Sequence, residues 1–127
     1  MMNSLDRDRA TVLVVDDDRA LRTLVAQALR SAGYRVISAV NGEEALHTVE
    51  GTSVDLIVSD IAMPCLDGRE LGHALWERRR HIPVLYMSAY PQNPALLPGA
   101  FLPKPFRYDE LLSRARDLLE GVGRIGG

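Results

Sequence analysis

The chain has 127 residues, the length of a single domain and enough for a hydrophobic core without disulfide bonds. Hydrophobic residues make up 46% and charged residues 25% of it, which excludes a disordered tail, a fibre and a disulfide scaffold. The formal charge of −2 offers no basic excess for binding nucleic acid through its phosphates, so we expect no nucleic-acid partner. Fourteen of the fifteen basic residues are arginines, and the one lysine is Lys104.

The sequence predicts neither a signal peptide nor a membrane span. No apolar run approaches the roughly 20 residues of a membrane span, and the arm 1–9 lacks the apolar centre of a signal peptide. The single cysteine, Cys65, cannot form an internal disulfide, which favours a reducing compartment. We therefore expect a cytoplasmic protein with no membrane partner.

The first half of the chain predicts two strand–helix pairs. The apolar run 11–15 is typical of a strand buried on both faces. The stripe from Leu21 to Ala32, which includes Leu24, has helical spacing and ends before Gly33. A second strand is expected at 34–40, followed by a helix that Asn41 and Glu44 begin as a capping box. Gly51 would end that helix.

The second half predicts three strands and two helices. Strands are expected at 54–59, 83–87 and 100–102, and a capping box of Asp67 and Glu70 begins a helix in which Trp76 would be partly buried. The last helix is expected to begin near 107 or 108 and to stop at Gly121, leaving 121–127 as a flexible tail. This divides the chain into an arm at 1–9, a domain at 10–120 and the tail.

Alternating strands and helices predict an α/β fold with a parallel sheet covered on both faces. Five strands at this size suit the doubly wound, flavodoxin-like order 2-1-3-4-5. One connection is irregular, because Pro91, Pro94 and Pro98 lie between the fourth and fifth strands. Prolines inside a helix break it, so we expect a loop or a single helical turn there.

Polar residues follow four of the five predicted strands. Asp16 and Asp17 follow the first, Asp60 the third, Ser88 the fourth and Lys104 the fifth. Because the strands of a parallel sheet end at one edge, and ligands bind outside that edge, these side chains should share one crevice.

This set of groups suits phosphoryl transfer onto a carboxylate. Crowded carboxylates repel one another unless a cation lies between them, and Mg²⁺ prefers oxygen ligands. Asp60, alone after its strand, is then the natural nucleophile, and Asp16 and Asp17 are the natural metal ligands. A hydroxyl and an ammonium group would neutralise the charge on the phosphoryl oxygens.

At this point the sequence resembles the receiver domains of response regulators in two-component signalling. The resemblance rests on Val12 to Asp18, on Asp60-Ile61-Ala62-Met63-Pro64 followed by Asp67-Gly68, on Ser88-Ala89 and on Lys104-Pro105-Phe106. These four motifs stand in order on the expected strands and cover about residues 10 to 120. The short, proline-containing connection before Phe101 is similar to receivers of hybrid sensor kinases and their stand-alone relatives, in which the family's fourth helix is shortened.

The resemblance implies a switch more than an enzyme. Asp60 would accept a phosphoryl group from the phosphohistidine of a sensor histidine kinase or a histidine phosphotransfer protein. We expect no output domain in 127 residues, so the signal would pass by protein contacts, by return of the phosphoryl group to a histidine or by inhibition of a kinase. Asp17 would bind Mg²⁺ directly and Asp16 mainly through water. The sequence indicates neither the downstream partner nor the oligomeric state.

The resemblance implies further roles. Asp60 and the backbone carbonyl of Ala62 would complete the metal ligands, and Ser88 and Lys104 would hold the phosphoryl oxygens. Ser88 and Phe101 would form the moving part of the switch. The Lys104–Pro105 peptide bond would be cis, which only bonds before proline adopt at low cost.

Tyr90 is a candidate for controlling access, because it stands two residues after Ser88 at the mouth of the crevice. Its ring would shield the acyl phosphate from water; a loop tyrosine with no kinetic effect is the alternative.

Two other functions stay open at this stage. Asp16 and Asp18 superficially resemble the Asp-x-Asp of haloacid-dehalogenase-type phosphatases, although Ala20 stands where that family has threonine, and Asp18 more simply begins a helix. The third reading is an interaction module that never turns over phosphate, and the complete set of site residues argues against it.

Overall fold

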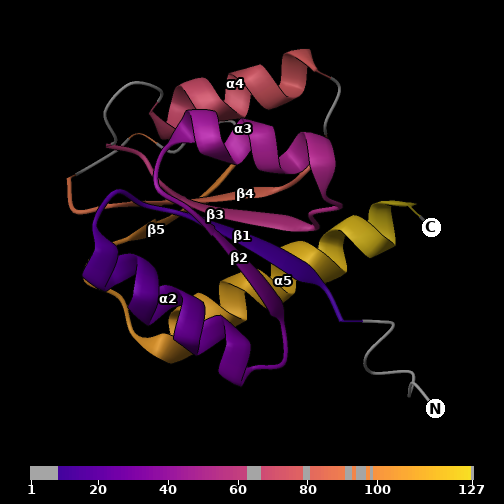
Figure 1. The fold of residues 1–127 in the computed structure, drawn as a ribbon. Coiled ribbons are helices and arrows are strands. Elements are labelled where there is room, and N and C mark those ends of the chain that lie inside the picture. The colour runs from indigo at the N-terminus through magenta and orange to yellow at the C-terminus, as the bar shows by residue number, and fades with distance from the viewer. Residues whose placement is uncertain are drawn as a thin grey trace.

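Five parallel strands form one sheet in the order β2-β1-β3-β4-β5, as the sequence predicts (Figure 1). The computed structural model describes residues 9–62, 67–78, 81–90, 93, 97 and 99–126, and only the backbone of 68, 69 and 122–126. The strands are β1 (Thr11–Val15), β2 (Arg35–Ala39), β3 (Leu56–Asp60), β4 (Val84–Ser88) and β5 (Ala100–Pro103). Observed and predicted strand ends differ by two residues or fewer.

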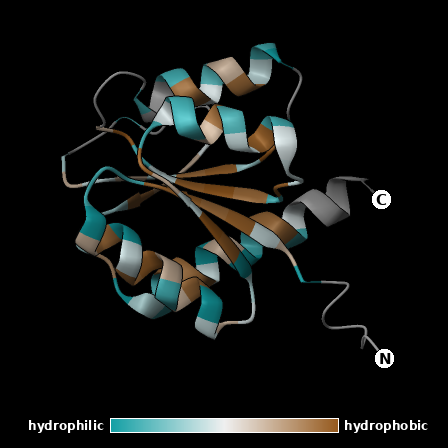
Figure 2. Ribbon diagram, in the orientation of Figure 1, coloured by the Kyte–Doolittle hydropathy of each residue, from teal (hydrophilic) through white to brown (hydrophobic). Residues whose placement is uncertain are grey.

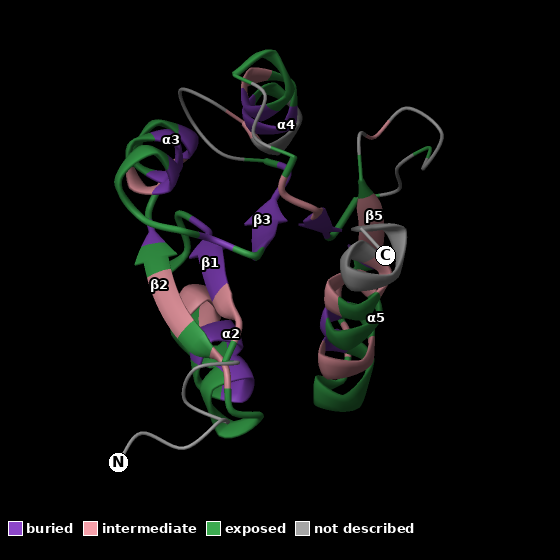
Figure 3. Cartoon of the chain, turned by 90° about the vertical axis from the view of Figure 1, so that its right-hand side faces the viewer, coloured by how far each residue is buried: buried purple, intermediate pink, exposed green. Residues whose placement is uncertain are grey.

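Two helices cover each face of the sheet. The helices are α2 (Arg19–Ser31), α3 (Gly42–Gly51), α4 (Gly68–Glu77) and α5 (Tyr108–Gly126). In Figure 1, α2 and α5 lie on one face and α3 and α4 on the other. Each face has its own hydrophobic cluster. Figure 2 shows the hydrophobic strands between helices whose outer surfaces are hydrophilic. In Figure 3 the central strands are buried, whereas β2 and β5 at the edges are partly exposed.

Local sequence signals account for most of the helix ends. The Asp18 side chain accepts hydrogen bonds from the amides of Ala20 and Leu21 at the start of α2. Asp67 and Glu70 form the predicted capping box at the start of α4. Gly33, with a φ of 99°, ends α2 in the left-handed conformation that glycine adopts without steric cost. The prediction for Asn41 was half right: its side chain accepts from the Glu44 amide, but the Glu44 carboxylate accepts from Val40.

The end predicted for the last helix was wrong, because α5 continues through Gly126. Of the glycines whose conformation is described, only Gly33 has a positive φ, so Gly121 stays helical and does not act as a stop signal. A glycine inside a helix costs about 1 kcal/mol, which lowers the stability of the helix without ending it.

Leu24, in the apolar stripe of α2, is 47% exposed, because it lines an open groove and does not reach the core. The prediction that Trp76 would be partly buried was wrong. Trp76 on α4 is 69% exposed, and its ring lies edge-on against His81, with the ring centroids 5.2 Å apart.

The connection from β4 to β5 contains no helix among its described residues, in agreement with the prediction of a loop or single turn. Where this connection returns to the sheet, Gly99 passes so close to β4 that a Cβ atom would lie 2.4 Å from the carbonyl oxygen of Val84. Only glycine fits there. Among the residues that the structure describes, no helix is both long and apolar enough to cross a membrane. The predicted roles of Cys65 and of the arm up to residue 8 lie outside the described residues.

Candidate functional site

The structure brings three carboxylates together at the carboxyl ends of β1 and β3. Carboxylate oxygens of Asp16, Asp17 and Asp60 lie within 4.8 Å of one another. Asp16 directly follows β1, and Asp60 is the last residue of β3, the neighbouring parallel strand. The topology that the sequence predicts is therefore what assembles this acidic cluster.

Asp16 is the most deeply buried member of the cluster, with no exposed surface. Its Oδ1 accepts a hydrogen bond from the Asp18 amide at 2.9 Å, but its Oδ2 is buried and has no hydrogen-bond partner in the part of the chain that the structure describes. Burial raises the pKa of the Asp16 carboxyl, and the neighbouring charge of Asp60 acts in the same direction. A buried carboxylate oxygen without a donor, beside two further carboxylates, fits a divalent cation.

Lys104 is the cation that lies against the carboxylates of Asp16 and Asp60. Its Nζ lies 3.5 Å from Oδ2 of Asp60 and 3.8 Å from Oδ2 of Asp16, and only 19% of its side chain is exposed. The backbone amide of Lys104 also donates to the carbonyl of Ser88 at 2.8 Å, which ties the end of β5 to the end of β4. The Lys104–Pro105 peptide bond is cis, as predicted.

One ammonium group does not balance three carboxylates. If all three are ionised, Asp16, Asp17, Asp60 and Lys104 together carry two net negative charges. The buried orphan oxygen and this charge excess are the two features of the site that match a bound divalent cation.

Asp60 and Ser88 lie side by side at the ends of β3 and β4. Asp60 is 8% and Ser88 2% exposed, and Asp60 pairs in register with Met87, the residue before Ser88. The amide of Ala62 donates to Oδ1 of Asp60 at 3.4 Å, so the loop after β3 folds back over the carboxylate.

The hydroxyl of Ser88 is oriented by the backbone. Its Oγ accepts a hydrogen bond from the Tyr90 amide at 3.0 Å. Because that bond uses a lone pair of the oxygen, the hydroxyl proton stays available to donate to a ligand. The Tyr90 side chain is 70% exposed, outside the buried part of the site. Phe101 is partly buried on the α3 and α4 face of the sheet.

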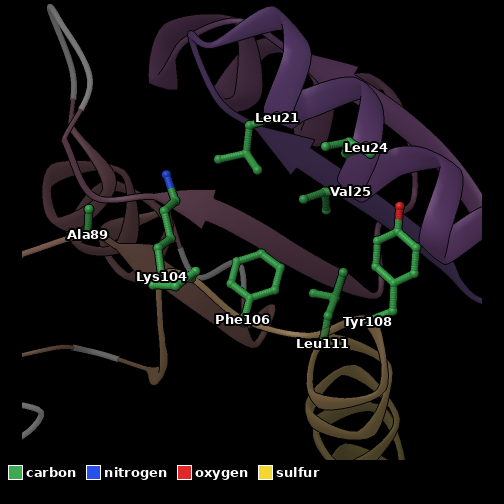
Figure 4. Close-up of a pocket in the computed structure, with 9 residues that line it drawn as sticks. Leu21, Leu24, Val25, Ala89, Lys104, Phe106, Tyr108 and Leu111 are labelled. Atoms are coloured by element: carbon green, nitrogen blue, oxygen red, sulfur yellow. The ribbon is translucent and has the colours of Figure 1, made fainter.

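An apolar groove runs from the site between α2 and α5. Its volume is about 430 Å³. In Figure 4, Leu21 and Leu24 of α2 face Phe106 and Tyr108 across it, and Lys104 closes one end. The same lysine therefore borders both the acidic cluster and the groove.

Arg22 is a site residue that the sequence analysis missed. Its Nη1 donates to the backbone carbonyl of Asp16 at 2.8 Å, which fixes the turn from β1 into α2. A signal was present, because Arg22 stands three and seven residues before the core residues Val25 and Leu29. A charged residue in an apolar helical stripe indicates a specific partner.

Comparison with known proteins identifies the family of this chain. Residues 12–116 match the response regulator receiver domain. The chain belongs to that family. The match lies inside the predicted domain at 10–120, and the family is the one that the sequence motifs resemble.

The relatives place receiver sequences in two kinds of protein. The chain is 39% identical over 119 residues to the sensor kinase CckA of Brucella abortus, covering 87% of this chain and 13% of the kinase. It is 39% identical over 114 residues to the response regulator MprA of Mycolicibacterium vanbaalenii, covering 85% of this chain and 49% of that regulator. The chain thus spans half or less of these relatives.

Among solved structures, the response regulator TrrA of Thermotoga maritima, in complex with Mg(2+)-BeF, has a TM-score of 0.79. It is 30% identical, and the match covers 86% of this chain and 98% of that one. The receiver fold therefore extends over nearly the whole of the described chain.

Proposed function

We propose that this receiver domain is a phosphorylatable switch in which Asp60 accepts a phosphoryl group. The observation that carries the proposal is the cluster of three carboxylates with the ammonium group of Lys104 at 3.5 Å from Asp60. A carboxylate oxygen of Asp60 attacks phosphorus, the bond from phosphorus to the donor's imidazole nitrogen breaks, and an acyl phosphate forms. The donor is a sensor histidine kinase or a histidine phosphotransfer protein.

Asp16, Asp17, Asp60 and the backbone carbonyl of Ala62 would hold Mg²⁺. When bound, this ion neutralises charge on the phosphoryl oxygens. Lys104 and the Ser88 hydroxyl donate to the same oxygens from the other side of Asp60. The movement of Ser88 toward the phosphoryl group, followed by repacking of Phe101, would carry the signal to a protein partner. A cytoplasmic location is part of the proposal.

The arrangement favours the switch over the phosphatase alternative. Asp18, the second aspartate of the Asp-x-Asp pattern, is exposed and caps α2, and it is not part of the acidic cluster. It accepts hydrogen bonds from two backbone amides there. The aspartate that joins Asp16 and Asp17 in the acidic cluster is Asp60, which lies on a different strand.

One experiment separates the three candidate functions. The protein is incubated with Mg²⁺ and acetyl phosphate, and the intact mass is measured for the wild type and for Asp60→Asn. The proposal expects one added phosphoryl group on the wild type and none on the variant. Multiple turnover of phosphate esters that requires Asp16 would indicate a phosphatase, and neither addition nor turnover would leave an interaction module.

A further inference from the structure

Arg22 of α2 holds the turn that carries two of the three carboxylates of the acidic cluster. Its Nη1 donates to the backbone carbonyl of Asp16 at 2.8 Å, six residues back along the chain. The backbone of Arg22 is fixed as well, since its amide donates to the carbonyl of Asp18 at 2.9 Å in the first turn of α2. The arginine therefore connects a helix that packs on the sheet to the loop at the carboxyl end of β1.

The backbone of Asp17 depends on this turn. A peptide unit is planar, so a hydrogen bond that fixes the carbonyl oxygen of Asp16 also fixes the plane containing the nitrogen and Cα of Asp17. On the other side, the amide of Asp18 donates to Oδ1 of Asp16 at 2.9 Å, which fixes the next peptide unit. Hydrogen bonds thus hold both peptide units that meet at the Cα of Asp17, and these units set the direction in which its side chain leaves the backbone.

Packing does not place the carboxylate of Asp17 in the way that it places the other two. Asp16 and Asp60 are buried, whereas Asp17 is exposed. Even so, carboxylate oxygens of all three lie within 4.8 Å of one another. An exposed ligand loses conformational entropy when an ion orders it, and a backbone that is already fixed lowers this cost.

We propose that Arg22 is a positioning residue for the divalent cation: its bond to the Asp16 carbonyl holds Asp17 where its carboxylate can join those of Asp16 and Asp60 on one ion. This inference rests on the proposed function, in which Mg²⁺ occupies the cluster. The guanidinium group lies against the backbone of Asp16, so its charge repels a cation bound there. By charge alone, removal of Arg22 would strengthen cation binding, whereas positioning predicts that removal weakens it.

The test measures the dissociation constant of the whole chain for Mn²⁺, which takes the same oxygen ligands as Mg²⁺. The electron paramagnetic resonance signal of free Mn²⁺ reports its binding. Arg22→Met keeps an unbranched, helix-forming side chain and removes the guanidinium group. It should weaken Mn²⁺ binding about three- to tenfold, less than many groups that orient metal ligands, because the lost repulsion offsets part of the loss. A merely structural role would lower the free energy of unfolding and leave the dissociation constant of the folded protein unaltered.

Arg30→Met is the matched control. Arg30 lies near the other end of α2, and its Nη2 also donates to a strand carbonyl, that of Val36 on β2, at 3.3 Å. The substitution removes the same charge and the same kind of bond away from the cluster, so Mn²⁺ should bind as it does to the wild type. Arg22→Gln, whose side chain is two bonds shorter than arginine, repeats the test if Arg22→Met does not fold.

The outcomes separate this inference from the proposed function. Equal or tighter Mn²⁺ binding by a folded Arg22 variant would overturn the inference, as would an equal loss of affinity in Arg30→Met. A wild type that does not bind Mn²⁺ would instead overturn the metal site of the proposed function, and the inference with it.

Discussion

At the scale of single residues, Lys104 shows how a composition bias can isolate a functional group. It is the one lysine beside fourteen arginines, and its Nζ lies between the carboxylates of Asp60 and Asp16. An ammonium group is a compact charge on a flexible stem, whereas guanidinium is a wide planar fork. An arginine at this mostly buried position would keep the charge but could not occupy the same space between two carboxylates.

We therefore expect Lys104→Arg to fold and to become phosphorylated at Asp60 while failing to switch. In the wild type, beryllium fluoride with Mg²⁺ should raise the thermal midpoint by several degrees, because the ligand binds only the folded state. In Lys104→Arg this rise should fall to less than half, although intact mass still shows phosphorylation by acetyl phosphate. Arg107→Lys, at an exposed position, serves as the control. If beryllium fluoride raised the thermal midpoint of Lys104→Arg as much as that of the wild type, the site would not require a lysine, and the single lysine would reflect only the composition bias.

Tyr90 contacts the site through its backbone amide, so the role of its side chain can be tested separately. Its amide holds the Ser88 hydroxyl, whereas its side chain is largely exposed. Tyr90→Ala keeps the amide and removes the ring, so the rate of phosphorylation should be unchanged. If the ring shields the acyl phosphate from water, the phosphorylated variant should lose its phosphoryl group about two- to tenfold faster, as followed by intact mass after removal of the donor. An unchanged rate of loss would show that Tyr90 acts on the site only through its backbone amide.

At the scale of elements, sequence analysis succeeded where the signal is local. The starts of α2 and α4 depend on an aspartate and the next three residues, and both were predicted correctly. The end of α5 was not, because a glycine stops a helix only when its φ becomes positive, as at Gly33 and not at Gly121. The same residue type thus has opposite roles in two helices, and conformation decides between them.

Edge strands illustrate a feature that the sequence alone did not reveal. An arginine from the neighbouring helix caps a backbone carbonyl on each edge strand of the sheet. Arg30 of α2 donates to Val36 of β2 at 3.3 Å, and Arg114 of α5 donates to Phe101 of β5 at 3.0 Å. Such contacts occupy backbone groups that would otherwise be open to pairing with another chain. They depend on how the helices lie on the sheet, so no local pattern predicts them.

At the scale of the whole molecule, the parallel topology made the acidic cluster predictable. Once the strands alternate with helices, their carboxyl ends must share one edge, and Asp16, Asp60, Ser88 and Lys104 meet there whatever the details of packing. The hydrogen bond from Arg22 to the backbone carbonyl of Asp16 was not predictable in this way, because it depends on the path of the turn from β1 into α2.

The same convergence makes the cluster a source of instability in the whole domain when no cation is bound. Asp16 is buried beside Asp60, and burial raises the pKa of its carboxyl, so its ionised form opposes folding at neutral pH. Asn at this position removes the charge and keeps an oxygen for the Asp18 amide. In EDTA, Asp16→Asn should therefore increase the free energy of unfolding by about 1–3 kcal/mol, as replacing a poorly compensated buried charge does elsewhere.

In excess Mg²⁺ the wild type should gain stability because the ion binds the folded state, and the variant should gain much less. Urea titrations of both proteins, with EDTA and with Mg²⁺, measure the four values. A variant less stable than the wild type in EDTA would show that the carboxylate of Asp16 is held by the fold and not by the metal.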